Sequence, residues 1–156
     1  MKKYKDSVSD FFRWVKGTEL VELDDIDVTE DPVRPELTLG FRITHGRKIF
    51  GLEYNGEIEA IICVAFTPEV PYTVREMDYM SREKEGKIAV AYTVWSRKRG
   101  AGKEIVKKLS NWAKNNKIER LVTLSPLTPM ATHFHIKNGA KQIYINEETQ
   151  NFEYKI

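Results

Sequence analysis

A basic, glycine-containing turn at residues 97–102, with the sequence RKRGAG, has the residue types that bind an anion. It follows an apolar run at 88–95, which predicts a buried strand, and precedes apolar residues at helical spacing over 105–113. Glycine lets a ligand approach the backbone closely, and the free N–H groups at a helix start favour an anion. An ordinary turn with solvated lysines would have the same composition. The basic side chains that would add charge to a phosphate-sized site are Arg97, Lys98, Arg99 and Lys103.

His135 is a candidate for an acid or a base. It lies on a short predicted helix at about 131–138, and Gly139 is suited to end that helix. Histidine can donate a proton near neutral pH, although a core histidine that bonds a carbonyl would fit the same pattern. His133 lies two positions away and would face another side of the helix. The two histidines therefore predict no metal site, and no metal-ligand spacing occurs elsewhere.

The turn between strand and helix resembles the acyl-CoA pyrophosphate loop of the GNAT acyltransferases, which has the pattern Arg-x-x-Gly-x-Gly. The resemblance implies that the turn and helix start hold the pyrophosphate of coenzyme A, with acetyl-CoA as the expected acyl donor. The residues concerned are Arg97, Lys98, Arg99, Gly100, Ala101, Gly102 and Lys103. It also implies that the pantetheine arm lies along the preceding strand, at Tyr92, Thr93 and Val94. Backbone N–H groups along 92–96 would then orient the arm and polarise the thioester carbonyl.

His135 occupies the position at which many GNAT enzymes carry a tyrosine, four residues before the glycine. That tyrosine protonates the departing CoA thiolate, so the resemblance implies the same role for His135.

Two other segments resemble the malonyl-CoA decarboxylases, whose catalytic domain is GNAT-like. They are Leu124-Ser125-Pro126 and the stretch FHIKNGA at 134–140. This second resemblance implies that Ser125 and His135 hold a malonyl carboxylate and protonate the carbanion left after loss of carbon dioxide. Those enzymes are larger, have a helical N-terminal domain and have more chain between the two motifs. Ser125 also has a simpler interpretation as a turn former before proline.

The remaining elements can be placed by their patterns. A short helix at about 7–16 precedes Gly17, an acidic segment of weak pattern covers 20–26, and two prolines predict a loop at 27–36. Asn55-Gly56 predicts a hairpin over 48–66, in which Ile58, Ala60, Ile62, Val64 and Phe66 share one face. Residues 72–86 fit a short helix or a loop, 120–125 predicts a strand, and 142–154 predicts a closing hairpin.

This order of elements matches the GNAT fold from about residue 48 to the end. We therefore expect an α/β (α+β) fold in one acyl-CoA-binding domain over residues 1–156. Its sheet would be mixed, mostly antiparallel and flanked by helices. The resemblance implies that the sheet is splayed between the strands at 87–95 and 120–125, and that the thioester arm enters the gap.

Composition places the chain among globular proteins. It has 156 residues, of which 41% are hydrophobic and 31% charged, and a net charge of +2, so its overall charge does not favour nucleic acid. Cys63 is the single cysteine, which excludes an internal disulfide and fits a reducing compartment. The N-terminus lacks the apolar stretch of a signal peptide, and no run approaches the roughly 18 apolar residues of a membrane span. We expect a cytoplasmic protein without membrane contact.

The function that we expect is transfer of an acyl group to an amine on a small molecule or a protein; homodimer formation stays open. Transfer needs a general base, for which the sequence offers Glu57, Glu59, Glu76 and Asp78 without choosing among them. The first alternative is the decarboxylase described above. The second is a nucleic-acid-binding module that uses residues 97–99, with Trp95 and Trp112 as stacking groups. Trp112 fits the buried face of its helix, so we do not expect nucleic acid as the partner.

Overall fold

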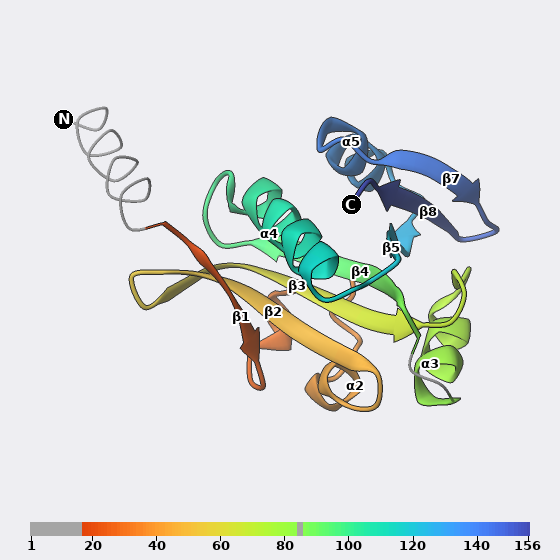
Figure 1. Ribbon diagram of the computed structural model, residues 1–156, viewed down its shortest axis with the longest axis horizontal. Coiled ribbons are helices and arrows are strands. Elements are labelled where there is room, and N and C mark those ends of the chain that lie inside the picture. The colour runs from red at the N-terminus through yellow and green to blue at the C-terminus, as the bar shows by residue number, and fades with distance from the viewer. Residues whose placement is uncertain (1–16, 84–85) are drawn as a thin grey trace.

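The computed structural model describes residues 17–83 and 86–156, and the helix expected at 7–16 lies outside them. A mixed, mostly antiparallel sheet of eight strands organises the described chain, in the order β1-β2-β3-β4-β5-β8-β6 with β7 paired to β8 (Figure 1). The strands are β1 Glu19–Leu23, β2 Arg47–Tyr54, β3 Glu57–Thr67, β4 Ile88–Ser96, β5 Arg120–Thr123, β6 Ser125–Pro126, β7 Lys141–Ile145 and β8 Thr149–Tyr154. The helices are η1 Val28–Glu30, α2 Leu39–Ile43, α3 Val74–Glu83, α4 Ala101–Asn115 and α5 Pro129–Lys137. The predicted fold class is confirmed.

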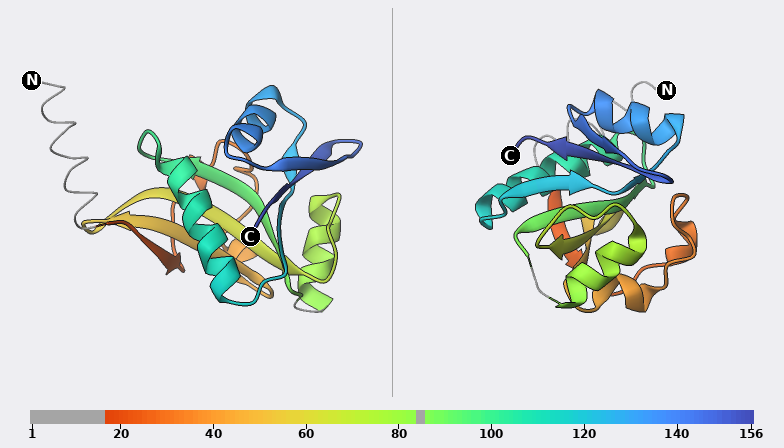
Figure 2. Two further views of the ribbon diagram at one scale, coloured as in Figure 1. Left: turned by 45° about the horizontal axis from the view of Figure 1, so that its top comes forward. Right: turned by 90° about the vertical axis from the view of Figure 1, so that its right-hand side faces the viewer.

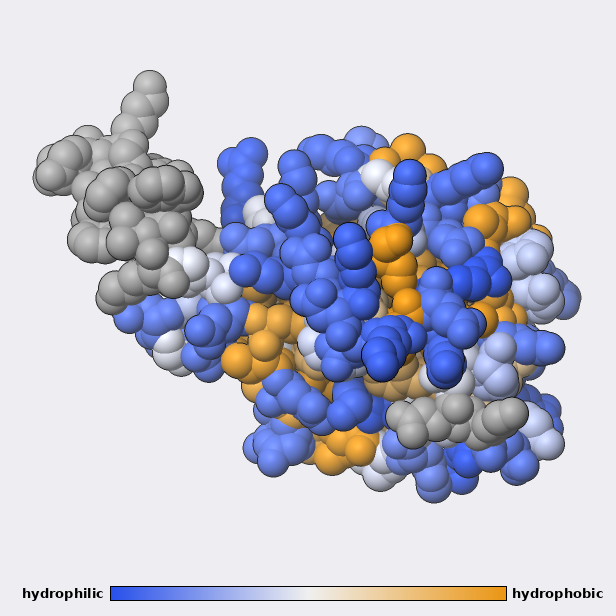
Figure 3. Space-filling model, in the orientation of Figure 1, coloured by the Kyte–Doolittle hydropathy of each residue, from blue (hydrophilic) through white to orange (hydrophobic). Residues whose placement is uncertain are grey.

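Both faces of the sheet are covered, because β3 and β4 carry apolar side chains in both directions. On one face, Ala60, Ile62 and Val64 pack against Ile105 and Leu109 of α4. On the other face, buried residues of β3 and β4 pack against Met77 of α3 and against side chains of α2. Figure 2 shows α4 crossing the sheet and α3 beside its lower end. The outer surface of α4 is mostly hydrophilic, as Figure 3 shows, so its lysines lie on a solvated face.

The hairpin between β2 and β3 forms where the sequence predicts it. Asn55 and Gly56 have φ angles of 52° and 82°, as a tight hairpin turn requires. The predicted shared face is wrong at Ile58, which packs on the opposite face from Ala60 and Ile62. The pairing runs from Leu52↔Ala60 to Glu53↔Ile58 and leaves Glu59 as an extra residue, which reverses the alternation.

The sheet splays where the sequence predicts it, between β4 and β5. Parallel pairing of these strands runs only from Ile88↔Arg120 to Ala91↔Thr123, although β4 continues to Ser96. The pairing of β3 with β4 shifts at the same place, from Val64↔Ala91 to Cys63↔Thr93, so that Tyr92 is a bulge residue. β4 therefore leaves β5 after Ala91 and remains paired on its other side only.

Three stretches contain elements that the sequence left open or did not predict. The segment of weak pattern at 20–26 contributes β1, paired with β2. The stretch at 28–43 contains η1 and the five-residue α2, which Thr38 caps by accepting a hydrogen bond from Phe41 N at 3.1 Å. Within the stretch that fitted a short helix or a loop, Val74–Glu83 forms α3. Within the described ranges, no helix is long and apolar enough to cross a membrane.

Candidate functional site

The start of α4 has the geometry of an anion site. Gly100 caps the helix with φ 83° and ψ −12°, in the left-handed region that favours glycine, and supplies no side-chain cap. Ala101 N bonds Lys98 O, so the helix start leaves the N–H groups of Gly102 and Lys103 without an intrahelical partner. A Cβ at Gly102 would lie 3.3 Å from Phe134 Cε2, whereas one at Gly100 would meet open space. The lack of a side chain at Gly102 leaves room for the ring of Phe134, and Gly100 adopts a left-handed backbone conformation that favours glycine.

The basic side chains of the turn do not all point into solvent. Arg97 forms a two-point ion pair with Glu30, with Nε–Oε2 at 2.9 Å and Nη2–Oε1 at 3.2 Å. Lys98 Nζ lies 3.3 Å from Glu59 Oε2 and over the ring of Tyr54. Arg99 and Lys103 are exposed and form no ion pair with the described part of the chain. Arg99 and Lys103 can therefore contact an anion without first breaking an ion pair.

A cavity of about 600 Å³ follows the splayed edge of β4 toward α5. The predicted residues that line it are Tyr92, Thr93, Val94, Gly102, Ser125 and His135. Glu30, Pro32 and Val33 close another side of it, and Phe134 separates Gly102 from His135 along its wall. The other predicted residues do not line the cavity: 97–100 form the turn that follows Ser96, and Ala101 and Lys103 lie in the first turn of α4. A more open hollow of about 820 Å³ contains His133, which confirms that the two histidines face different sides of α5.

The open edge of β4 presents backbone groups to the cavity. Arg97 N donates to Glu59 O at 2.8 Å, which makes these two residues a hydrogen-bonded pair of the β3–β4 ladder. Because such pairs alternate, Trp95 also points its peptide groups at β3, whereas Val94 and Ser96 point theirs away from it. Of the N–H groups along 92–96 that were expected to face a ligand, those of Val94 and Ser96 are the ones that point away from β3.

His135 is buried and its ring is fixed in place. Its Nδ1 lies 2.7 Å from Tyr154 Oη, and the ring stacks on Phe152 at 5.1 Å. Burial lowers the pKa of His135 from 6.5 to about 4, so the ring is neutral at pH 7. Donation of a proton by a charged imidazolium near neutral pH, as the sequence suggested, is therefore not available to it. A neutral ring can still donate one hydrogen bond into the cavity.

Ser125 lies in the wall of the same cavity, so the structure brings it and His135 to one site. It is 3% exposed, and its hydroxyl donates to Thr123 Oγ1 at 2.8 Å rather than to the histidine.

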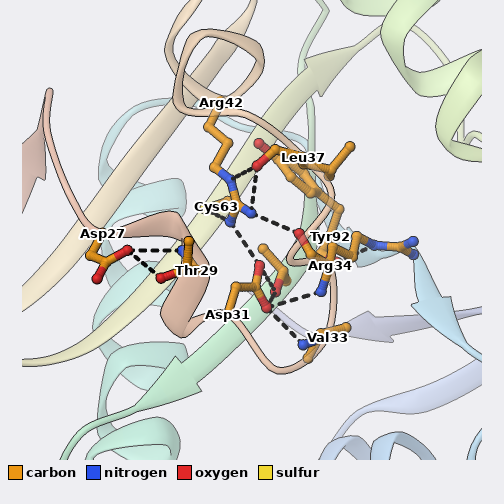
Figure 4. Close-up of polar contacts among 10 residues, drawn as sticks. Asp27, Thr29, Asp31, Val33, Arg34, Leu37, Arg42, Cys63 and Tyr92 are labelled. Atoms are coloured by element: carbon orange, nitrogen blue, oxygen red, sulfur yellow. Dashed lines mark hydrogen bonds and ion pairs between the residues drawn. The ribbon is translucent and has the colours of Figure 1, made fainter.

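Buried charges, which no sequence pattern indicated, fix the loop between η1 and α2 to the splay (Figure 4). Arg34 Nε donates to Tyr92 O at 2.9 Å and its Nη2 donates to Leu124 O at 3.0 Å, so it bridges the two diverging strands. Arg42 is fully buried and pairs with Asp31 at 2.7 Å, and Asp31 also accepts from Thr93 Oγ1 at 2.8 Å. No periodicity distinguishes a buried arginine from an exposed one. The one sequence feature that marked these buried charges was a charged loop that contains two prolines.

None of the four carboxylates proposed as the base lines the cavity. Glu57 is exposed at the hairpin, and Glu59 is buried beside Lys98 rather than solvated. Glu76 accepts from Tyr72 N, and Asp78 pairs with Arg47 and Arg82. Among the described lining residues, the one carboxylate is Glu30.

The two tryptophans proposed to stack on nucleic acid and the single cysteine all pack in or against the core. Trp95 is 7% exposed, and Trp112 packs on Phe50 with ring centroids 4.9 Å apart, so neither offers an exposed stacking surface. Burial raises the pKa of the Cys63 thiol to about 12, as expected for a core residue. The described residues contain no group of three or more His, Cys, Asp or Glu side chains able to hold a metal ion.

No known family profile matches this sequence, and neither does any curated protein. Solved structures do match its fold. Malonyl-CoA decarboxylase from Rhodopseudomonas palustris superimposes with a TM-score of 0.69 at 16% identity, over 96% of this chain and 63% of that one. A Bacillus subtilis acetyltransferase in complex with CoA gives 0.62 at 10% identity, over 89% and 97%. The GNAT domain of S. lividans PAT gives 0.58 at 14% identity, over 89% of each chain.

These likenesses show the fold. The chain has the architecture shared by GNAT acetyltransferases and malonyl-CoA decarboxylase, as both resemblances in the sequence indicated. It covers 63% of the length of the Rhodopseudomonas decarboxylase and 42% of that of the malonyl-CoA decarboxylase from Agrobacterium vitis.

Proposed function

We propose that this protein is an acyl-CoA-dependent N-acyltransferase that uses acetyl-CoA and acts on an amine. One observation carries the proposal. An open strand edge, at Val94 and Ser96, leads from the free N–H groups at the start of α4 into a cavity that contains His135. This arrangement offers an anion site, then a row of peptide groups, and then a buried polar side chain, in the order in which CoA carries its pyrophosphate, amide-bearing arm and thioester.

The residues of the turn fit the pyrophosphate. The N–H groups of Gly102 and Lys103 would bind its oxygens, and the exposed cations Arg99 and Lys103 would neutralise its charge. The absence of a Cβ at Gly102 lets Phe134 pack closely against the helix start and keeps the Gly102 N–H group uncovered by a side chain of its own. Acetyl-CoA supplies the activated thioester when bound.

The peptide groups of Val94 and Ser96 would hold the arm as a neighbouring strand does, and an N–H group there would polarise the thioester carbonyl. His135, neutral and held by Tyr154, would donate a hydrogen bond to the carbonyl oxygen or to sulfur. Because it carries no extra proton at pH 7, the sulfur would take its proton from the attacking nitrogen. In transfer, the C–N bond forms and the C–S bond breaks.

Decarboxylation of malonyl-CoA is the second candidate, since Ser125 and His135 share one wall of the cavity. A carbanion is a much stronger base than a thiolate, so a neutral imidazole is a suitable donor for it. The surrounding charge favours transfer instead. Of the described lining residues none is Lys or Arg, and Glu30 would repel a malonyl carboxylate.

One experiment separates the two candidates. The protein is incubated with malonyl-CoA alone and, separately, with acetyl-CoA and a panel of amines, while free thiol, acetyl-CoA and carbon dioxide are measured. We expect free CoA only when an amine is present. Release of acetyl-CoA and carbon dioxide from malonyl-CoA alone would overturn the proposal in favour of the decarboxylase.

A further inference from the structure

The ion pair between Glu30 and Arg97 joins the two functional parts of the site. Glu30 belongs to the lining of the cavity, whereas Arg97 begins the anion-binding turn, 67 positions later in the sequence. The side chains are 37% and 39% exposed, so the pair lies at the mouth of the cavity, in reach of an entering ligand.

Glu30 is anchored through its backbone. Its N–H donates to Asp27 O at 3.2 Å, and Asp27 caps η1 by accepting from Thr29 N. The next residue, Asp31, is buried and bound to both Arg42 and Thr93. The position of Glu30 at the mouth is therefore fixed, while its partly exposed side chain can change its partner.

A pyrophosphate in the turn would compete with Glu30 for Arg97. A partly exposed ion pair contributes little to stability, because water screens it. Arginine binds phosphate oxygens through paired, charge-assisted hydrogen bonds, and pyrophosphate carries more charge than one carboxylate. The N–H groups of Gly102 and Lys103 would hold the phosphate beside the turn and further favour the exchange.

We propose that binding of the CoA pyrophosphate takes Arg97 from Glu30, and that the freed Glu30 carboxylate acts as the general base for the acceptor amine. The inference rests on the proposed function. Glu30 is suited to the role because it is the carboxylate among the described lining residues, and a base must reach the nitrogen that it deprotonates. The exchange makes the base available only when the acyl donor is in place.

The proton balance is complete. The amine arrives as an ammonium ion and gives one proton to Glu30. Its nitrogen then bonds the carbonyl carbon, and the electron pair of the broken C–S bond stays on sulfur. The second nitrogen proton goes to sulfur, which yields the amide and the CoA thiol, and Glu30 returns its proton to water.

The test combines CoA affinity, measured by calorimetry, with amine-dependent release of thiol from acetyl-CoA. The variants are Glu30→Gln, Arg97→Gln and the double variant. Glu22→Gln is the matched control, because Glu22 also pairs with a partly exposed cation, Lys48, and does not line the cavity. We expect Glu30→Gln to bind CoA up to about fivefold more tightly, because Arg97 is no longer shared. Its turnover should fall by ~10²–10⁴-fold.

In the Arg97→Gln background, Glu30→Gln should leave CoA affinity unchanged, and Glu22→Gln should match the parent in both measurements. Unchanged or weaker CoA binding by Glu30→Gln overturns the exchange. Turnover of Glu30→Gln within about twofold of the parent overturns the base, even if transfer itself is confirmed. A parent that acylates no amine overturns both the base and the proposed function, while the affinity comparison still decides the exchange of Arg97.

Discussion

The neutral state of His135 should make the protein less stable in mild acid. Burial lowers the pKa of the folded state from 6.5 to about 4, so between these values the unfolded chain binds more protons than the folded one. The stability contributed by the neutral ring is fully present above about pH 6.5 and is lost progressively as the pH falls toward 4. The full difference between the two pKa values corresponds to about 3 kcal/mol.

The perturbation that isolates this effect is His135→Gln, which keeps a polar side chain and removes the titration. It should lower stability at pH 7, because Tyr154 Oη loses its partner at 2.7 Å, by about 1–3 kcal/mol. Between pH 7 and 5, however, the parent should lose about 2 kcal/mol that the variant does not lose. His133 is exposed, so His133→Gln should follow the parent throughout.

The assay is urea unfolding at half-unit intervals from pH 7.5 to 4.5 on the parent and both variants. Titration of carboxylates such as Glu153, whose pKa is lowered by the hydrogen bond from Arg120, also destabilises the protein toward the acidic limit, but it is common to all three proteins and cancels in the comparison. Parallel losses of stability in the parent and in His135→Gln would refute the burial argument. They would also restore a charged imidazolium as a proton donor in the site.

Two further outcomes follow from the packing of the site. Gly102→Glu, checked for folding by circular dichroism, should bind CoA at least about tenfold more weakly, because its side chain and charge would crowd Phe134 and obstruct the N–H groups at the start of α4; calorimetry measures this, and unchanged affinity in the folded variant would rule out the pyrophosphate assignment. Arg42→Met should lower the free energy of unfolding by about 3–5 kcal/mol, since it leaves Asp31 charged and buried, whereas Arg82→Met removes an exposed ion pair and should cost less than about 1 kcal/mol in the same urea titration.

The sequence predicted the parts of this structure that have strong local patterns. The Asn55-Gly56 hairpin, the strand, turn and helix over 88–115, and α5 were all found, because turn residues and apolar periodicity determine them locally. β1 was missed since its side chains are only half buried at the edge of the sheet, and α2 was missed because five residues give no period.

The site was predictable only in part, because local sequence patterns reveal some of its residues and the contacts of the others lie far away in the sequence. Ser125 and His135 could be placed in one cavity through a family resemblance, and the glycines of the turn through their chemistry. Glu30, Arg34 and Arg42 could not, because their roles depend on contacts with strands 58 or more residues away or on burial that a polar loop does not reveal. The pKa of His135 likewise depends on what covers it.

The splay at Ala91 divides the sheet into two groups of strands, which differ in how far apart in the sequence their paired strands lie. β1 to β4 pair with their neighbours in sequence, whereas β5 reaches β4 only after the long α4, through four parallel pairs and the bridge from Arg34. Contacts between distant segments form late and open early, so this junction should exchange its amide protons sooner than the β2–β3 pairing. A ligand arm that pairs with Val94 and Ser96 would serve as the strand that the junction lacks. Binding would then slow amide exchange in both groups of strands together, and the substrate would act as a structural member of the sheet.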